Sequence, residues 1–490
     1  MVVAFGMGRR NHFWRVAAVR SLTLVVLLAC GVPSEPGGLG ALEVTVDPAL
    51  PNVVHVSWTG VEGVSRVEYG LDGAFDESTP TSRESSATVL EVKSGRTYAM
   101  RAVTVDFDGL EWRSEPTEVT IAAPFAGMPV VEITDVDPAA WEGDGFVLMS
   151  IFQATTSFLA LVDREGDFVW TMQSRAGAII PSAHLSEDGR RIIYIDNDFF
   201  GSGWGGVGVV ALDGSSHTFR ELPNGHHDAI ELPDGSMAWL EFEQREVVLE
   251  SGDTAIITSD AIYTAPSIDG PARRVFSILD DYGHTPWHVC SHSASQVPVV
   301  GGEDFTHGNT LIFDAERDAF LYTPKFLDAI VAVDRQSGAL NWQAGGRFGS
   351  FTDEDGDTID PDRAYDVDGP NRTWWSHAHM SHAWADGFVL YDNGTHHSPL
   401  VSRVAAYTWD VEAATLKRTF EFVNESGIYD PILGDVRKLD GGNYLVAWTM
   451  SGSMTEITPA GEVVWRMSVE LGSGVGRTGY VPTLYQVTYQ

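Results

Sequence analysis

The segment Val331-Ala-Val-Asp-Arg-Gln-Ser-Gly-Ala-Leu-Asn-Trp342 contains an apolar strand, a turn with an acid and a glycine, and a second strand that ends in tryptophan. The same design recurs at residues 161–170 and 457–465, and a second hairpin type alternates with it at 185–194, 232–239 and 439–448. Two alternating hairpins make a four-stranded antiparallel sheet, the blade of a β-propeller. At about 60 residues per blade, residues 126–490 predict six blades. A pair of β-sandwiches is the alternative.

Residues 42–123 form a separate all-β unit, because apolar and polar residues alternate at period two between turn residues. Trp58 lies in one expected strand, and Tyr98 follows a glycine turn at the head of another. A tyrosine in that place is typical of a tyrosine corner, in which the hydroxyl bonds back to the backbone. The unit resembles a fibronectin type III domain. We therefore expect an all-β chain, with a β-sandwich at 42–123 followed by a six-bladed β-propeller.

The charge of the chain excludes two classes of partner. A chain of 490 residues implies at least two domains, and its formal charge is −37. Removal of residues 1–29, which carry four arginines and no acid, would take the charge to −41. Such a surface repels nucleic acid and anionic lipid. An anionic substrate would need positive groups of its own in the site.

The first residues predict export. A basic stretch from Arg9 to Arg20 precedes the apolar run Leu22–Leu28, which is too short to span a bilayer. Leu27-Leu-Ala-Cys30 resembles a bacterial lipobox, so we expect a signal peptide at 1–29, lipidation of Cys30 and a flexible tether at 30–41. Secretion with cleavage near Ala29 is the alternative. The expected location is the cell envelope (outer membrane, periplasmic face or cell surface), with the lipid anchor as the only membrane contact.

Histidines recur at matching places of the repeat. His227 and His379 each precede a glycine by eight positions and are followed by an apolar strand, and His307 also stands just ahead of one. If the sheets are arranged radially, these residues converge on one axis. Imidazoles can bind a metal, or stabilise a transferring anion while one acts as nucleophile. The candidate site comprises His226, His227, Asp228, His307, Asn309, Lys325, His377, His379 and His382.

Two neighbouring features point to other chemistry. His377-Ala-His-Met-Ser-His382 is similar to the HxHxDH zinc signature of metallo-hydrolases, but Ser381 replaces its aspartate. A metal-dependent hydrolase therefore stays only an alternative. Cys290 is expected to be a buried, inert thiol rather than a reactive nucleophile.

Residues 180–490 resemble the bacterial PAPS-independent aryl-sulfate sulfotransferases, which are built on a six-bladed propeller. The matching segments are His226-His-Asp-Ala to Gly235, Asp304-Phe-Thr-His-Gly-Asn309, residues 328–346, His379 to Gly394, and Tyr480-Val-Pro-Thr-Leu-Tyr485. The resemblance implies transfer of a sulfuryl group from an aryl sulfate to a phenol through a sulfo-histidine. It places the nucleophile at His379, and at His227 and His307 the histidines that hold sulfuryl oxygens or shuttle protons.

One departure from the family pattern lies at Lys325, where the family has an arginine. Lysine keeps the charge and loses the bidentate fork that suits a sulfate. This leaves open weak activity, another sulfated or phosphorylated substrate, or a cell-surface protein that binds without turnover.

An acidic loop precedes the His377–His382 segment. Asp353, Asp355, Asp357 and Asp360 bunch as in a calcium site, but their order departs from the EF-hand register. A solvated loop is the preferred interpretation. No cofactor is expected, apart from calcium as a structural ion in this loop. The oligomeric state stays open.

Overall fold

The computed structural model describes residues 38–153, 156–175, 177–197, 205–283, 289–290, 292, 302–356, 374–470 and 472–485. Strands dominate this part of the chain, and its one α-helix is the single turn α1 (Ile278–Asp281). The all-β prediction is confirmed. None of the helical segments in these residues is long and apolar enough to cross a membrane.

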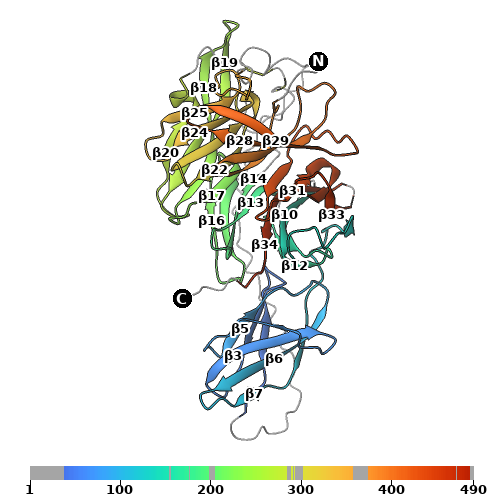
Figure 1. Cartoon of the computed structure of the whole chain (residues 1–490). Coiled ribbons are helices and arrows are strands. Elements are labelled where there is room, and N and C mark those ends of the chain that lie inside the picture. The colour runs from blue at the N-terminus through green and yellow to red at the C-terminus, as the bar shows by residue number, and fades with distance from the viewer. Residues whose placement is uncertain are drawn as a thin grey trace, which may run out of the picture.

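The N-terminal part consists of two sheets around one core (Figure 1). The first sheet has the order β1–β2–β5: β1 (Glu43–Val46), β2 (Val54–Ser57) and β5 (Ser86–Val89). The second has the order β4–β3–β6–β7, with β8 also on β6: β3 (Gly63–Leu71), β4 (Glu77–Ser78), β6 (Thr97–Asp106), β7 (Glu111–Arg113) and β8 (Thr117–Thr120). Trp58, Tyr69 and Tyr98 are buried between them. The Lys93 amide donates to the Tyr98 hydroxyl over 2.9 Å, the bond expected of a tyrosine corner.

Six largely antiparallel sheets follow in the described part of the chain. The bounds of their strands are β9 (Val131–Thr134), β10 (Phe146–Gln153), β11 (Thr156–Val162), β12 (Phe168–Gln173), β13 (Ile179–Leu185), β14 (Arg191–Asn197), β15 (Gly205–Ala211), β16 (His217–Glu221), β17 (Gly225–Glu231), β18 (Met237–Val248), β19 (Thr254–Ala265), β20 (Arg273–Ser277), β21 (Glu303–Asp304), β22 (Gly308–Asp314), β23 (Ala319–Pro324), β24 (Ala329–Asp334), β25 (Leu340–Gly345), β26 (His379–Trp384), β27 (Gly387–Asp392), β28 (Arg403–Asp410), β29 (Thr415–Val423), β30 (Asp435–Lys438), β31 (Tyr444–Trp448), β32 (Ser453–Ile457), β33 (Val463–Val469) and β34 (Gly474–Val481).

Four of these sheets run in chain order, as β13–β16, β17–β20, β22–β25 and β26–β29. The other two combine distant parts of the chain. The last strand, β34, pairs with β10 to complete the sheet of β10–β12, and β9 pairs with β33 at the edge of the sheet of β30–β33. The short strand β21 lies parallel to β19.

The strands at one edge of each sheet (β13, β17, β22, β26, β30 and β34) touch one another in turn. Contacts join β13 to β17, β17 to β22, β22 to β26, β26 to β30, β30 to β34 and β34 back to β13. Successive antiparallel sheets whose innermost strands lie side by side make a β-propeller-like fold. These sheets form the upper part of the molecule (Figure 1).

The tryptophans that end the hairpins link successive sheets. Trp170 on β12 donates its indole N–H to the Leu212 carbonyl, which follows β15 in the next sheet, over 3.0 Å. Trp465 on β33 donates to the Arg164 carbonyl in the β11–β12 turn, also over 3.0 Å. The repeated tryptophan therefore serves packing between sheets.

The sandwich is held to the rest of the chain by polar contacts. Lys93 forms ion pairs with Asp163 at 2.7 Å and Asp167 at 3.0 Å, on either side of the β11–β12 turn. The Leu90 amide donates to the hydroxyl of Tyr485, beyond β34, over 2.7 Å. Both ends of the propeller-like part therefore contact the sandwich.

Candidate functional site

Three successive sheets contribute one histidine each to a single cluster. Their first strands β17, β22 and β26 contact one another in that order. His227 lies in β17, His307 directly precedes β22 and His379 begins β26. The ring centroids of His227 and His307 are 4.7 Å apart, and His379 is near enough to affect the pKa of His227. The structure thus brings the three histidines together.

The backbone at these histidines departs from regular strand geometry. His227 and His307 have positive φ angles of 53° and 50°. The pairing register shifts beside both residues and also just after His379. Left-handed backbone in a residue with a Cβ costs on the order of 1–3 kcal/mol and concentrates at functional sites. A bulge re-aims side chains out of the strict alternation of a strand.

Two carboxylates are linked to the His227–His307 pair, Asp304 directly and Asp260 through His226. Asp304 Oδ2 lies 2.5 Å from His307 Nδ1. His226 Nδ1 lies 2.9 Å from His227 Nδ1, and His226 Nε2 lies 3.1 Å from Asp260 Oδ1. Because Nδ1 is engaged in both rings, Nε2 is the nitrogen that His227 and His307 present to a ligand.

The tautomer of His379 is set by Asn393. The Asn393 amide nitrogen donates to the carbonyls of Asp430 and Leu433, so its oxygen faces His379 Nδ1 at 2.6 Å and accepts that proton. His379 Nε2 keeps its lone pair and accepts the Leu433 N–H over 3.1 Å. A neutral imidazole in this tautomer is a nucleophile at Nε2.

Burial keeps His379 and His227 neutral. It lowers the pKa of His379 well below 6.5, and the charge of Lys325 lowers that pKa further. Burial also holds the pKa of His227 well below 6.5, with His307 as the next cause. Lys325 is itself only 1% exposed. Burial lowers the pKa of its ammonium to about 8, while Asp304 acts in the opposite direction.

Asn309 connects two strands of the cluster. Its amide nitrogen donates to the carbonyl of Ala378, the residue before His379, over 3.0 Å. Its buried Oδ1 has no hydrogen-bond partner among the described residues. Asn309 therefore positions the start of β26.

Among the described residues, the contacts of Asp228 are internal. Its carboxylate accepts hydrogen bonds from Ser182, His184 and the Leu311 amide and pairs with Arg477 at 2.6 Å. Despite burial, Arg477 and His184 hold the pKa of Asp228 far below its usual range. These contacts fit a positioning role, whereas the sequence suggested substrate contact.

His226 and His382 also have internal contacts. The His226 ring stacks on Phe242 with centroids 3.6 Å apart. His382 Nδ1 accepts the Lys438 amide over 3.3 Å, and burial followed by Arg437 lowers its pKa to about 3. His377, the remaining candidate, contacts Cys290 and His396 in a second cluster.

The acidic loop is described only in part. Asp353 Oδ1 accepts the Asp355 amide over 3.0 Å in a turn, and Asp355 is exposed. Asp357 and Asp360 lie outside the described residues, as does Cys30.

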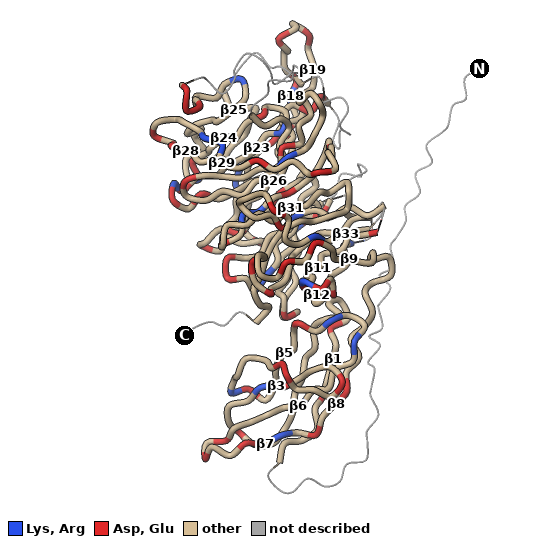
Figure 2. Tube along the Cα trace, turned by 45° about the vertical axis from the view of Figure 1, so that its right-hand side comes forward, with Lys and Arg blue, Asp and Glu red and all other residues tan. Residues whose placement is uncertain are grey.

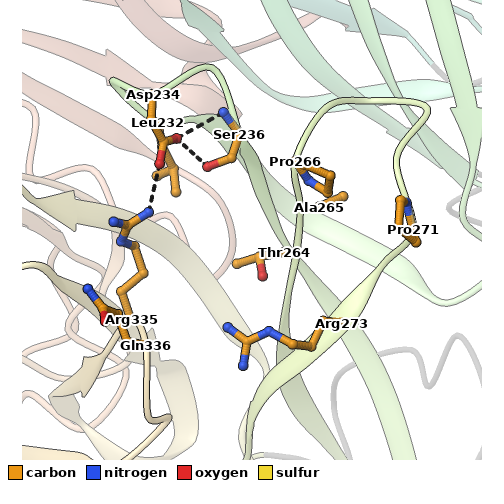
Figure 3. A pocket seen from close by; sticks show the side chains of 10 residues that line it. All are labelled: Leu232, Asp234, Ser236, Thr264, Ala265, Pro266, Pro271, Arg273, Arg335 and Gln336. Atoms are coloured by element: carbon orange, nitrogen blue, oxygen red, sulfur yellow. Dashed lines mark hydrogen bonds and ion pairs between the residues drawn. The ribbon is translucent and has the colours of Figure 1, made fainter.

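A separate surface pocket lies away from the cluster (Figure 3). Its walls come from the β17–β18 turn, the end of β19 and the β24–β25 turn. Arg335 of the last turn pairs with Asp234 of the first at 2.9 Å. Of the candidate site residues that the structure describes, none lines this pocket.

The arylsulfotransferase (ASST) family model matches residues 132–471, a range that includes most of the six sheets and leaves out the N-terminal sandwich. The chain belongs to the arylsulfotransferase family. No curated protein matches it.

Several solved structures are similar to this chain at low sequence identity, and their descriptions name other activities or none. The periplasmic gluconolactonase PpgL of Pseudomonas aeruginosa is 15% identical over 85% of this chain and 99% of that chain, with a TM-score of 0.35. A protein of unknown function from Bacteroides caccae is 13% identical over 66% and 94%, with a TM-score of 0.34. A streptogramin B lyase is 11% identical over 69% and 98%, with a TM-score of 0.33. Similarity this low carries no argument about activity.

Within this arylsulfotransferase-family chain, sequence reasoning missed the partners of the cluster. Asp304 stands three residues before His307, a spacing that a search for carboxylate–histidine pairs would have found. Asn393 lies fourteen residues after His379 and meets it because β26 and β27 pair as a hairpin. Asp260 and His396 carry no local signal in the sequence.

Proposed function

We propose that this arylsulfotransferase-family protein transfers a sulfuryl group from a phenolic sulfate ester to a phenolic acceptor through a sulfo-histidine at His379. The observation that carries the proposal is the convergence of His227, His307 and His379 from three sheets beside a buried Lys325. Burial and proximity to Lys325 keep His379 neutral, as a nucleophile requires.

In the first half-reaction, the Nε2 lone pair of His379 attacks sulfur. The sulfur–oxygen bond to the aryl group breaks, and the phenolate leaves with the bonding electrons. Nδ1 keeps its proton and its bond to Asn393, which stabilises the positive charge that develops on the ring. The Lys325 ammonium supplies a fixed donor for the sulfuryl oxygens and stabilises the transition state, whereas the Nε2 atoms of His227 and His307 can accept a proton.

In the second half-reaction, the acceptor phenol oxygen attacks the same sulfur. The nitrogen–sulfur bond breaks and its electrons return to Nε2, which restores neutral His379. The acceptor proton passes to a neighbouring imidazole. His307 suits this step because Asp304, 2.5 Å from its Nδ1, stabilises the imidazolium that forms. Because the donor is itself an aryl ester, the cycle needs no nucleotide sulfate.

A binding protein without turnover is the second candidate, and one contact favours it. The Leu433 N–H occupies the lone pair of His379 Nε2 at 3.1 Å. Transfer requires that the arriving sulfuryl group displace this hydrogen bond. A protein in which Leu433 keeps it would bind a sulfate ester without reacting.

Mass spectrometry of the protein after incubation with a generic aryl sulfate separates the two candidates. We expect an added SO₃ group on the peptide that contains His379, with release of one phenol per site. His379→Ala should abolish both signals, whereas His217→Asn, at an exposed position on β16, should keep them. Binding of the ester without phenol release or adduct in the wild type would establish the binding protein instead.

We also propose an architecture and a location for this function. The successive contacts among β13, β17, β22, β26, β30 and β34 support a closed six-bladed β-propeller over residues 126–490. The Tyr98 contact supports a fibronectin type III domain at 42–123 as a spacer above the membrane. Residues 1–29 would be the signal peptide, and lipidated Cys30 with a tether to residue 41 would anchor the protein. Cys30→Ser should release the protein from the membrane fraction, and its retention there would contradict the anchor.

A further inference from the structure

A second cluster of metal-ligating side chains lies beside the candidate active site. It contains Cys290, His377 and His396, which are 2%, 0% and 0% exposed, together with the half-buried His292. These residues come from three separate segments. His377 precedes β26, His396 follows β27, and Cys290 and His292 lie between α1 and β21.

Three ligand atoms of this cluster lie at the spacing of a tetrahedral site. Cys290 Sγ is 3.4 Å from His377 Nε2 and 3.5 Å from His396 Nε2, and the two nitrogens are 3.2 Å apart. Zinc bonds of about 2.1 Å to nitrogen and 2.3 Å to sulfur, at tetrahedral angles, place ligands about 3.4 Å (N to N) and about 3.6 Å (N to S) apart. Each side of the observed triangle lies within about 0.2 Å of these separations.

Hydrogen bonding alone explains the triangle poorly. Each imidazole nitrogen has one in-plane position, which holds either a proton or a lone pair. Nε2 of His377 and Nε2 of His396 each take part in two of the three contacts, so one position on each ring would have to serve two partners. One cation at the centre satisfies both nitrogens and the sulfur at once. His292 can supply a fourth ligand. Ligand atoms of His292, Cys290 and His396 all lie within 4.8 Å of one another.

We propose that Cys290, His377, His396 and His292 bind one zinc ion. Binding removes the proton of the Cys290 thiol, so one proton is released and a Zn–S bond forms. Thiolate and imidazole donors in tetrahedral array select zinc over calcium or magnesium. The site shares only His377 with the HxHxDH-like segment. Because four protein ligands fill the coordination of the ion and leave no position for substrate, the site is structural.

The ion would position the candidate active site without touching substrate. The His377 amide donates to Asp328 Oδ1 over 2.6 Å, and the His377 ring packs on Phe326 with centroids 5.1 Å apart. The His396 amide donates to Ser376 Oγ over 3.1 Å. Zinc would therefore hold the residues just before His379 in place against the Lys325–Asp328 turn. The site stands independently of the proposed function, because metal binding needs no reaction.

Metal analysis of the purified full chain tests the proposal. After equilibration with zinc and removal of the excess, we expect one zinc per chain in the wild type and in His217→Asn. We expect less than a tenth of that in the Cys290→Ser, His396→Asn double variant. In cobalt-substituted wild type, a thiolate-to-cobalt charge-transfer band and intense visible bands should report a tetrahedral sulfur-containing site, and Cys290→Ser should remove the charge-transfer band.

A second measurement uses the wild-type protein and so does not depend on whether the variants fold. Chelation of wild-type zinc should lower the thermal unfolding midpoint, and added zinc should restore it. His379→Ala should still bind one zinc, so loss of sulfuryl transfer and loss of the metal are separate outcomes. Wild type that takes up no zinc and shows no cobalt–thiolate band would overturn the proposal, as would full zinc occupancy in the double variant.

Discussion

At the scale of single residues, the cluster depends on imidazoles whose Nδ1 atoms are engaged by neighbouring side chains. Asn393 fixes the proton of His379 on Nδ1, and Asp304 and His226 engage Nδ1 of the neighbouring rings. Positive charge is then concentrated on Lys325, which is buried. The side chain at position 325 therefore has the largest influence on an anionic group in the cluster.

Replacement of that lysine by arginine tests this influence. Lys325→Arg should leave kcat/KM for an aryl sulfate unchanged or raise it by up to about tenfold, or about 1.4 kcal/mol, because the guanidinium binds two sulfuryl oxygens at once. Steady-state phenol release measures the effect. Lys417→Arg, at an exposed position on β29, is the matched control and should not change the rate. A large loss in Lys325→Arg would show that the buried site admits only the narrower ammonium.

At the scale of elements, the sheets are joined by buried contacts between neighbours. One such contact links the first and last sheets of the propeller-like part. Arg164, in the β11–β12 turn, pairs with Glu456 on β32 at 2.7 Å, and the two side chains are 2% and 0% exposed. The Arg164 guanidinium also lies over the Trp465 ring, 5.2 Å from its centroid.

Removal of the carboxylate should destabilise this junction strongly. Glu456→Gln leaves the Arg164 charge buried without a counter-charge, which costs about 3–5 kcal/mol of unfolding free energy. Denaturant unfolding followed by tryptophan fluorescence measures the loss. Glu462→Gln, at an exposed turn position, should cost less than about 0.5 kcal/mol. Equal losses in the two variants would mean that Arg164 reaches solvent.

At the scale of the whole molecule, buried histidines make stability depend on pH. Burial keeps His382 neutral, with a pKa of about 3, and Arg437, His184 and Lys438 face it with positive charge or further imidazole. Burial also lowers the pKa of His184, although Asp228 opposes this. The unfolded chain, in which the histidine pKa is near 6.5, therefore binds more protons than the folded chain as pH falls.

Stability should fall with pH in the acidic range. Between pH 6.5 and the folded pKa values, each such histidine contributes up to about 1.4 kcal/mol of lost unfolding free energy per pH unit. Denaturant midpoints at several pH values measure this slope. His382→Gln should reduce the slope, because it removes one of the contributing groups. An unchanged slope in that variant would place the proton uptake elsewhere.

The net charge of the whole molecule acts on the arrival of substrate. Acidic residues recur in turns over both parts of the molecule, with few basic residues between them (Figure 2). This surface repels an anionic sulfate ester, and salt screens the repulsion beyond about 10 Å at 0.1 M. Initial rates of phenol release at low ester concentration should therefore rise from low to physiological ionic strength. A steep fall over this range would show that local attraction dominates.

The alternation of apolar and polar residues was sufficient to predict the all-β class, because strand periodicity is a local property of the chain. The repeated Trp-ending hairpins likewise predicted a succession of four-stranded sheets, and the histidines at matching positions predicted convergence. The role of the tryptophans was not predictable, since Trp170 and Trp465 bond to a neighbouring sheet, a contact between segments far apart in sequence.

The tertiary structure alone decided which groups each imidazole meets. Asn393 reaches His379 through a hairpin register, and His226 reaches Asp260 across a sheet. The same holds for Cys290, for which the sequence favoured an inert thiol and which the fold places against two histidines 87 and 106 residues away. Local sequence determines which side of a strand a residue occupies. Its chemistry depends on partners that long-range packing brings within hydrogen-bond distance, and no local pattern encodes that distance.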